Sequence, residues 1–461
     1  MSDRTRHADP TSAAATSTTS RLHLPARHLS RRRFLALAGG LVAVGCSSDG
    51  GIVSPVGSTT TRPSTDAPTT TASGSGGPVP TTAPGTVTSV TVPDEATDGR
   101  VLVVVRLDGG NDAANTVVPD LGSYRDLRPS IALADDVLLD HTALPGHALH
   151  PSLAPLVPLL DSDELAVVAG VGFADPDRSH FTSIDRWDRA DLMDETIGWL
   201  GRWLDTLDAD LPSLGALALG DAGLVMAGRS RQPTVIQDVD AFAYPSGVSN
   251  ADIRALADGT TGDPLRDAAR SAFLASVGAV EEFDEIADAV RDAESADADG
   301  EFAPPSGPFA NGLAVAAELI RSDVGTTVVS VSGSGFDTHA GQLDLHAALL
   351  DDLATGIAEF WSTLRRSGDA DRVLLMTTSE FGRRAFENGS AGTDHGAGGC
   401  SFLVGDPVTG GLHGTIDTDD IVDGDLRPTF DPREMFTACL DWLGADAERV
   451  LGARHDHTFL A

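Results

Sequence analysis

Apolar residues in this chain gather into short unbroken runs that alternate with longer stretches of helical spacing. Unbroken runs are typical of strands that are buried on both faces, as in a parallel sheet. The first run breaks at Asp108-Gly109-Gly110, where turn residues end the strand. The runs that predict strands span 101–107, 165–170, 326–332, 372–378 and 401–404.

Helical spacing of apolar residues follows or precedes most of these runs. Strands that alternate with helices favour an α/β domain with a mostly parallel central sheet flanked by helices. We also expect a helical insertion at about residues 205–300. The stretches that predict helices span 263–298, 306–323, 343–367 and 432–443.

The first 45 residues have the features of an export signal. Ser-Arg-Arg-Arg-Phe-Leu at 30–35 fits the twin-arginine pattern, and an apolar run follows it up to Cys46. This run is well short of the roughly 20 residues that span a bilayer. Ala-Val-Gly-Cys at 43–46 resembles a lipobox, which predicts a lipid on Cys46. We therefore expect twin-arginine export and anchoring at the outer face of the cytoplasmic membrane or in the cell wall.

Residues 46–98 consist almost wholly of Ser, Thr, Pro and Gly, a composition that predicts a solvated tether. The folded domain is then expected at 99–461. Two cysteines remain there, Cys400 and Cys439, and the sequence leaves open whether they form a disulfide or stay as buried thiols.

Charge excludes one class of function. The chain has a net charge of −36, and residues 1–45 hold seven Arg against two Asp, so the remainder stands at −41. Such a field repels polyphosphates, which argues against a nucleic-acid partner. The chain contains no lysine, so any side chain that clamps an anion must be an arginine.

Candidate chemistry follows the ends of the predicted strands, where ligand sites lie in open parallel sheets. Carboxylates together with imidazoles suit transition metals, and Zn, Mn or Fe are the natural candidates, as one or two ions. The candidate residues are Asp108 and Asn111 after the first strand, Asp337 and His339 after the third, Glu380 after the fourth, and Asp394 and His395 beyond it.

Each of these residues also has a structural explanation. The Asp108 segment is rich in turn residues, and Asp337 could cap the following helix. Glu380 could pair with Arg383. The glycine-rich loop around His395 is harder to explain without function. A further segment holds Ser179 and His180 as a candidate nucleophile and its neighbour, although Ser179 could equally cap a helix.

The motifs around these residues resemble a twin-arginine-exported bacterial family, catalogued as domain of unknown function fifteen hundred and one. The motifs are Leu-Asp-Gly-Gly-Asn-Asp at 107–112, Arg-Ser-His-Phe at 178–181, Phe-Asp-Thr-His at 336–339, Ser-Glu-Phe-Gly-Arg at 379–383 and Gly-Thr-Asp-His-Gly at 392–396. The resemblance covers about residues 97–455. The family is similar in fold to the alkaline phosphatase and sulfatase superfamily, whose members use two metals and a Ser, Thr or modified Cys nucleophile.

This resemblance implies roles for individual residues. Asp108 and Asp337 would bind metal, with His339 beside Asp337. Glu380 takes the place of the superfamily's aspartate, and Phe381 takes the place of its histidine, which leaves one ligand missing. His395 would stand for the late histidine, supported by Asp394.

Two functions follow as hypotheses. The first is a metal-dependent hydrolase of a phosphate or sulfate ester, in which Ser179 or a metal-bound water attacks and Arg383 holds a small anionic substrate. The second is a non-catalytic lipoprotein of the cell surface that binds an envelope polymer or a partner protein.

Overall fold

The computed structural model describes residues 97–208, 211–237 and 307–461, with scattered residues between 254 and 290. The expected signal peptide and Cys46, nearly all of the expected tether, and about half of the expected helical insertion lie outside the described residues.

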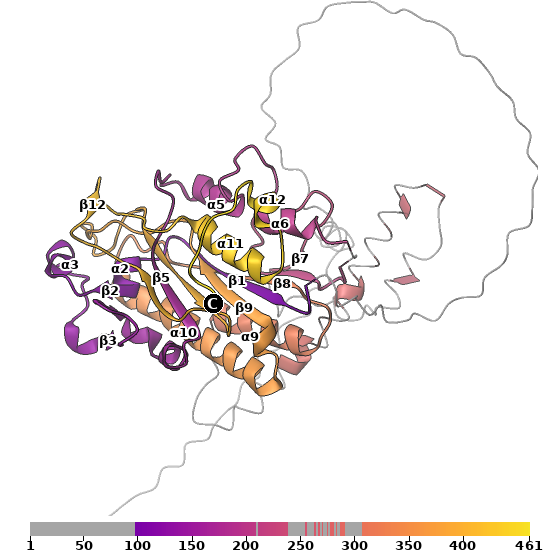
Figure 1. Ribbon diagram of the computed structural model, residues 1–461, viewed down its shortest axis with the longest axis horizontal. Coiled ribbons are helices and arrows are strands. Elements are labelled where there is room, and N and C mark those ends of the chain that lie inside the picture. The colour runs from indigo at the N-terminus through magenta and orange to yellow at the C-terminus, as the bar shows by residue number, and fades with distance from the viewer. Residues whose placement is uncertain are drawn as a thin grey trace, which may run out of the picture. The chain divides into compact units, whose positions relative to one another are not determined.

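A mixed, mostly parallel sheet of eight strands forms the centre of the domain, in the order β11-β5-β10-β9-β1-β8-β6-β7 (Figure 1). The strand β1 pairs in parallel with both β8 and β9, so it lies in the interior of the sheet. The strands of this sheet are β1 (Val101–Asp108), β5 (Leu165–Val171), β6 (Ala216–Leu219), β7 (Thr234–Ile236), β8 (Val328–Ser334), β9 (Val373–Thr378), β10 (Gly399–Val404) and β11 (Gly411–Gly414).

Helices cover both faces of this sheet, because its central strands are apolar on both sides. Val101, Val103 and Val105 of β1 face one core with α9 and α10, whereas Leu102 and Val104 face a second core with α6, α11 and α12 (Figure 1). The predicted α/β class is therefore confirmed. The helices are α2 (Ala113–Thr116), α3 (Gly122–Leu127), α4 (Val157–Asp161), α5 (His180–Asp188), α6 (Trp199–Leu204), α9 (Pro308–Arg321), α10 (Gln342–Ser367), α11 (Pro432–Trp442) and α12 (Ala447–Leu451).

Smaller elements complete the described part of the chain. A three-stranded sheet has the order β2-β4-β3, and β12 pairs with β13. Both cysteines of the domain are buried free thiols. The remaining elements are β2 (Val117–Pro119), β3 (Leu139–Asp140), β4 (His147–Leu149), β12 (Ile421–Val422), β13 (Asp425–Leu426) and the 3₁₀ helices Asp135–Val137, Pro151–Leu156 and Ala370–Arg372.

The strand β10 runs against its neighbours. It pairs antiparallel with both β5 and β9, whereas β1, β8 and β9 are mutually parallel. The residues that precede β10 therefore reach the same edge of the sheet as the residues that follow β5, β8 and β9. In an all-parallel sheet they would lie at the opposite edge.

One boundary differs from the expectation. The region from about residue 205 was expected to begin a helical insertion, but 216–219 and 234–236 form β6 and β7 of the central sheet. The apolar run Ala-Leu-Ala-Leu of β6 is too short to stand out from a helical pattern in the sequence.

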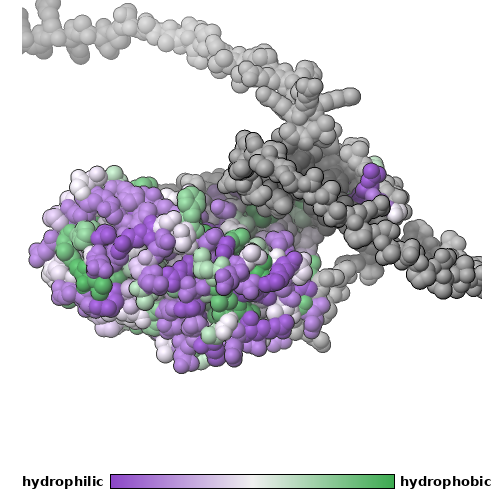
Figure 2. Space-filling model, turned by 90° about the horizontal axis from the view of Figure 1, so that it is seen from above, coloured by the Kyte–Doolittle hydropathy of each residue, from purple (hydrophilic) through white to green (hydrophobic). Residues whose placement is uncertain are grey.

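Hydrophilic residues dominate the surface of the described domain, and hydrophobic ones form only small patches in the view of Figure 2. None of the helices in the described part of the chain combines the length and the apolarity that a transmembrane span requires.

Candidate metal centre

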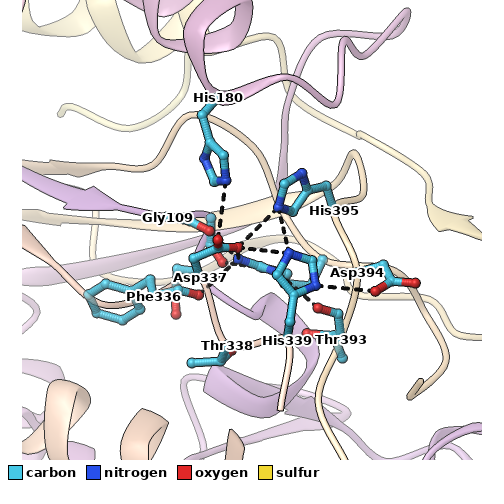
Figure 3. Close-up of polar contacts among 12 residues, drawn as sticks. Gly109, His180, Phe336, Asp337, Thr338, His339, Thr393, Asp394 and His395 are labelled. Carbon is cyan, nitrogen blue, oxygen red and sulfur yellow. Dashed lines mark hydrogen bonds and ion pairs between the residues drawn. The ribbon is translucent and has the colours of Figure 1, made fainter. Parts of the chain in front are cut away.

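Three loops bring imidazoles and a carboxylate together at the carboxyl edge of the sheet. His180 begins α5 after β5, Asp337 and His339 follow β8, and His395 precedes the reversed strand β10. One potential ligand atom each from His180, Asp337 and His395 lies within 4.8 Å of the others (Figure 3). The fold thus collects donors from residues more than 200 positions apart in the chain.

Asp337 is the hub of this cluster. Its Oδ1 atom lies 3.0 Å from the Nε2 atom of His395 and 3.0 Å from the Nε2 atom of His339. Its Oδ2 atom lies 3.5 Å from the Nε2 atom of His180. Burial by itself would raise the pKa of this carboxyl, but the hydrogen bond and charge of Arg383, together with the neighbouring imidazoles of His395 and His339, lower it to about 2. Asp337 is therefore a carboxylate at neutral pH.

His339 adds a third imidazole to the group. Its Nε2 atom lies 2.9 Å from the Nε2 atom of His395. The Nε2 atoms of all three histidines therefore point toward Asp337 (Figure 3). We call His180, Asp337, His339 and His395 the His/Asp cluster.

The other nitrogen of each imidazole faces an acceptor. Nδ1 of His180 lies 2.7 Å from Oε1 of Glu380, and Nδ1 of His395 lies 2.7 Å from the carbonyl oxygen of Arg178. Nδ1 of His339 lies 3.2 Å from Oδ1 of Asp394. A carbonyl or carboxylate oxygen only accepts, so each Nδ1 donates to its partner in the Nδ1–H tautomer.

In the Nδ1–H tautomer the free lone pairs lie on the Nε2 nitrogens. A neutral imidazole with a proton on Nδ1 has an unprotonated Nε2. The Nε2 atoms of His339 and His395 would then face each other with two lone pairs at 2.9 Å, next to the carboxylate of Asp337. Such an arrangement repels itself unless a cation, either a proton or a metal ion, lies among these atoms.

Two of the predicted metal ligands contact histidines of the cluster from the outside and are not part of it. Glu380 accepts hydrogen bonds from the amide of Gly109 and faces Nδ1 of His180, and its side chain is almost completely buried. Asp394 faces Nδ1 of His339 and accepts from the side chain of Asn388. Both carboxylates orient an imidazole and leave its Nε2 free.

The other predicted metal acid, Asp108, lies apart from the cluster. Its Oδ1 atom accepts a hydrogen bond of 3.2 Å from the buried guanidinium of Arg106. Burial raises its pKa to about 6, and the nearby charge of Glu380 adds to this effect, while Arg106 opposes it. The structure thus gives Asp108 an arginine partner and does not bring it to the three histidines.

Arg383 was predicted to clamp a substrate anion, but the structure buries it completely. Its guanidinium donates to the carbonyl oxygens of Gly110, Thr393 and Phe336, and also to Oδ1 of Asp337. These contacts tie the loops of the cluster together and direct the guanidinium away from a ligand in solvent.

The two predicted catalytic residues outside the cluster have different surroundings. Ser179 is exposed and lies directly before His180, but its hydroxyl makes no hydrogen bond to any described residue. Asn111 is buried, and its side chain contacts Cys400, Thr116 and His346. Asn111 therefore belongs to a polar core beneath the cluster and has no route to a ligand.

Phe381 lies against the cluster on one side. Its ring centroid is 4.6 Å from that of His395 and 5.0 Å from that of His180, and the side chain is buried. The phenyl ring supplies an apolar wall where the family resemblance implies a missing ligand.

Sequence reasoning assigned His180 to catalysis and did not identify it as a potential ligand. It also missed the carbonyl of Arg178, since a backbone acceptor has no sequence signal. Sequence reasoning also missed Gln342, whose side chain contacts Thr338 and Thr393 behind the cluster. The sequence shows that Thr338 and Thr393 lie close to His339 and His395, but it does not show that both threonines contact Gln342.

Comparison with known proteins identifies the family. The family described as "Protein of unknown function (DUF1501)" matches residues 180–459, more than half of the chain, and the chain belongs to it. This confirms the resemblance that the sequence motifs indicate. No curated protein matches the chain.

Solved structures give weak similarities only. A protein in the alkaline phosphatase superfamily from Vibrio parahaemolyticus has 10% identity and a TM-score of 0.34, over 77% of this chain and 69% of that one. The phosphonate monoester hydrolase SpPMH from Silicibacter pomeroyi has 10% identity and a TM-score of 0.36, over 77% and 75%. Ps i-CgsB in complex with k-i-k-neocarrahexaose has 9% identity and a TM-score of 0.35, over 77% and 74%. Similarity at this level identifies neither a substrate nor the role of a residue.

Proposed function

We propose that this member of the DUF1501 family is a metal-dependent hydrolase of phosphate or sulfate esters, with the metal held by the His/Asp cluster. One observation supports the proposal above the others. Three imidazoles, each with Nδ1 committed to an acceptor, direct their Nε2 atoms at one carboxylate.

The donor set fits a transition metal. Imidazole nitrogens with one carboxylate suit Zn, Mn or Fe, whereas Ca and Mg prefer oxygen donors alone. His180, Asp337 and His395 would hold the ion, with His339 beside Asp337 and His395. A divalent ion bound there supplies Lewis-acid polarisation of an ester oxygen.

The residues around the cluster orient the imidazoles. Glu380, Asp394 and the carbonyl of Arg178 hold the imidazole rings with Nε2 inward. Phe381 excludes water from one side of the cluster. These contacts give the site a fixed shape before any substrate arrives.

Two arginines near the cluster could hold an anionic substrate. Nη2 of Arg178 lies 2.5 Å from Oδ2 of Asp425, and Nε of Arg384 lies 3.9 Å from Oδ1 of the same carboxylate. Two guanidinium groups thus share one buried acid. The side chain of Arg178 is 40% exposed, so it is accessible to a small anionic ester. Arg178 and Arg384 replace Arg383 as our candidates for holding that anion.

Ser179 remains our candidate nucleophile, since it is exposed and adjacent to His180. The alternative is attack by water, and substitution of Ser179 by alanine separates the two. Loss of turnover with retained metal supports the serine, and retained turnover supports water.

The test of the proposal measures metal content and ester hydrolysis on the same protein. Purified wild type should contain stoichiometric transition metal by mass spectrometry and hydrolyse an aryl phosphate or an aryl sulfate. His395→Ala and Asp337→Ala should each reduce both. His413→Ala is a matched control, because His413 lies at β11 and contacts Thr409 and Thr458 outside the cluster.

Two results would overturn the hydrolase. Absence of metal from the wild type, even after incubation with Zn, Mn and Fe, removes the basis of the proposal. Bound metal without turnover of any phosphate or sulfate ester favours the second hypothesis, a surface lipoprotein that binds an envelope polymer or a partner protein.

We also propose, from the sequence, that the protein is exported by the twin-arginine route and held at the membrane by a lipid on Cys46. The pattern at 30–35 and the lipobox-like 43–46 support this proposal.

A further inference from the structure

We propose that Gln342 is a positioning residue, whose side-chain amide fixes the two loops that bring Asp337, His339 and His395 together. The inference rests on the proposed metal site and adds a residue that contacts none of the potential ligands. Gln342 is the first residue of α10 and is completely buried.

The amide of Gln342 joins the two loops through a pair of threonine hydroxyls. Its Oε1 atom lies 3.1 Å from Oγ1 of Thr338 and 2.7 Å from Oγ1 of Thr393. Thr338 lies between Asp337 and His339 in the chain. Thr393 precedes Asp394 and His395. One acceptor atom therefore holds the neighbours of three cluster residues.

The orientation of this amide is determined by its other end. Nε2 of Gln342 donates to Oδ2 of Asp112 at 2.5 Å, and Nη1 of Arg128 lies 2.5 Å from the same oxygen. Burial alone would raise the pKa of Asp112, but the charge and hydrogen bond of Arg128 lower it, so this group is a carboxylate. A carboxylate only accepts, so Nε2 must face it and Oε1 must face the threonines.

A chain of fixed contacts thus runs from a buried ion pair to the cluster. Arg128 and Asp112 have no exposed side-chain surface, so the pair cannot reorient without unfolding its surroundings. Thr338 and Thr393 are likewise buried. Because both threonine hydroxyls donate to Gln342, neither is free to rotate, and each backbone segment that they belong to is held in place.

Backbone contacts place the same two loops close together, but they do not replace the amide. The amide of Thr393 donates to the carbonyl of Thr338 at 3.1 Å, and the amide of Gln342 donates to the carbonyl of Ala391 at 2.9 Å. These bonds set the distance between the loops. The paired threonine hydroxyls add a side-chain restraint on the two backbone segments that carry Asp337, His339 and His395.

The test uses isosteric pairs that remove or keep each hydroxyl in the full-length protein. Thr338→Val and Thr393→Val should each weaken Co²⁺ binding about 10-fold, the lower end of the effect typical of residues that support metal ligands. Both should also alter the visible absorption spectrum of the Co²⁺-loaded protein. Thr338→Ser and Thr393→Ser restore the hydroxyl and should restore both readouts. Gln342→Met should show the combined loss.

Thr437→Val controls for the general cost of removing a buried hydroxyl. Thr437 is completely buried in α11, and its hydroxyl donates to the carbonyl of Arg433. This variant should lower the melting temperature and leave Co²⁺ affinity and spectrum unchanged. The threonine pairs keep the test decisive even if Gln342→Met fails to fold.

The outcomes distinguish this inference from the proposed function. If wild type binds Co²⁺ and the valine variants bind it with the same affinity and spectrum, Gln342 has only a structural role and the inference is overturned alone. If wild type binds no metal, both the hydrolase and the positioning role are overturned.

Discussion

The three histidines of the cluster place their two ring nitrogens in the same way. Each places Nδ1 against a fixed acceptor and turns Nε2 toward Asp337. The acceptors differ, since His180 faces a buried carboxylate, His339 an exposed one, and His395 a carbonyl. The ring of His180 is therefore held by the least accessible charged partner.

Substitution of Glu380 tests this support directly. Glu380→Gln removes the negative charge next to Nδ1 of His180 and should weaken metal binding by about 10-fold or more. A competition titration with a coloured chelator measures the change. Glu318→Gln is the control, because Glu318 pairs with Arg321 at the surface of α9. Equal affinities for both variants would show that the charge of Glu380 is not needed.

A second residue-scale prediction concerns pH and the polar core beneath the cluster. Burial lowers the pKa of His346 to about 3, from an ordinary value of 6.5. Below pH 6.5 the unfolded chain therefore binds a proton at His346 that the folded chain does not bind. The free energy of unfolding falls as the pH drops below about 6.5. At pH 5 this one residue should cost about 2 kcal/mol in the free energy of unfolding.

His346→Gln removes that titration and keeps a side-chain donor for Asn111. Denaturant unfolding of the metal-free protein at pH 7 and pH 5 should then show a loss about 2 kcal/mol smaller in the variant than in wild type. The neighbouring His150, whose pKa burial lowers to about 4, contributes equally to both proteins. Equal losses in both proteins would contradict the assignment.

Residue roles were only partly predictable from the sequence. Asp337, His339 and His395 were selected correctly for proximity, because strand ends of a parallel sheet share an edge. Asp108 also lies at a strand end, but its carboxylate forms an ion pair with Arg106, a neighbour on the same strand. Residues two positions apart on a strand share a face, so the sequence pattern was compatible with this pairing, but it did not show whether Asp108 would contact Arg106 or a metal.

At the scale of elements, α9 and α10 depend on each other at their contact. The N-cap of α9 is Gly307, which has no side chain to accept from the first amides of the helix. Asp352 of α10 does so instead, accepting from Phe309 at 3.0 Å and from Ala310 at 3.2 Å. The cap of one helix is thus supplied by the middle of another.

Removal of this cap should destabilise the domain. Asp352→Ala should lower the free energy of unfolding by about 1–2 kcal/mol, since an N-cap acceptor is lost and buried amides stay unpaired. Asp351→Ala is the matched control, because Asp351 precedes Asp352 in α10 and its side chain is exposed. Thermal unfolding compares the two, and equal melting temperatures would show that Asp352 does not cap α9.

The elements themselves were largely predictable. Four apolar runs became β1, β5, β8 and β9, because strands buried on both faces leave the plainest pattern. The direction of β10 was not predictable, since an apolar run reads the same for a parallel and an antiparallel strand. The short strands β6 and β7 were missed for lack of length.

At the scale of the whole molecule, the proposed site forms only when the domain has folded, which bears on the proposed twin-arginine export. Its potential ligands extend from His180 to His395, and the twin-arginine route transports folded proteins. We therefore expect the metal to be bound in the cytoplasm. Replacement of both Arg31 and Arg32 by Lys should retain the protein in the cytoplasm with its metal, as fractionation and mass spectrometry would show.

The lipid anchor has its own test. Cys46→Ala should export normally but release the protein from the membrane fraction into the medium or the soluble envelope fraction. Labelling with a radioactive fatty acid should mark wild type alone. A variant that stays in the membrane fraction would contradict anchoring at Cys46 and would leave the hydrolase proposal unaffected.

The reversed direction of β10 has a consequence for how this protein can vary. Residues 379–398 leave the sheet at the end of β9 and return to it at the start of β10, and both points lie at the edge that holds the cluster. Both attachment points of this segment, which we call the 379–398 cassette, are fixed by the sheet, while Glu380, Arg383 and His395 within it belong to the site. Insertions within it would reshape the surroundings of the site without disturbing a single strand. Divergence in substrate among relatives should therefore concentrate there, and a transplanted cassette should transfer specificity between two members of the family.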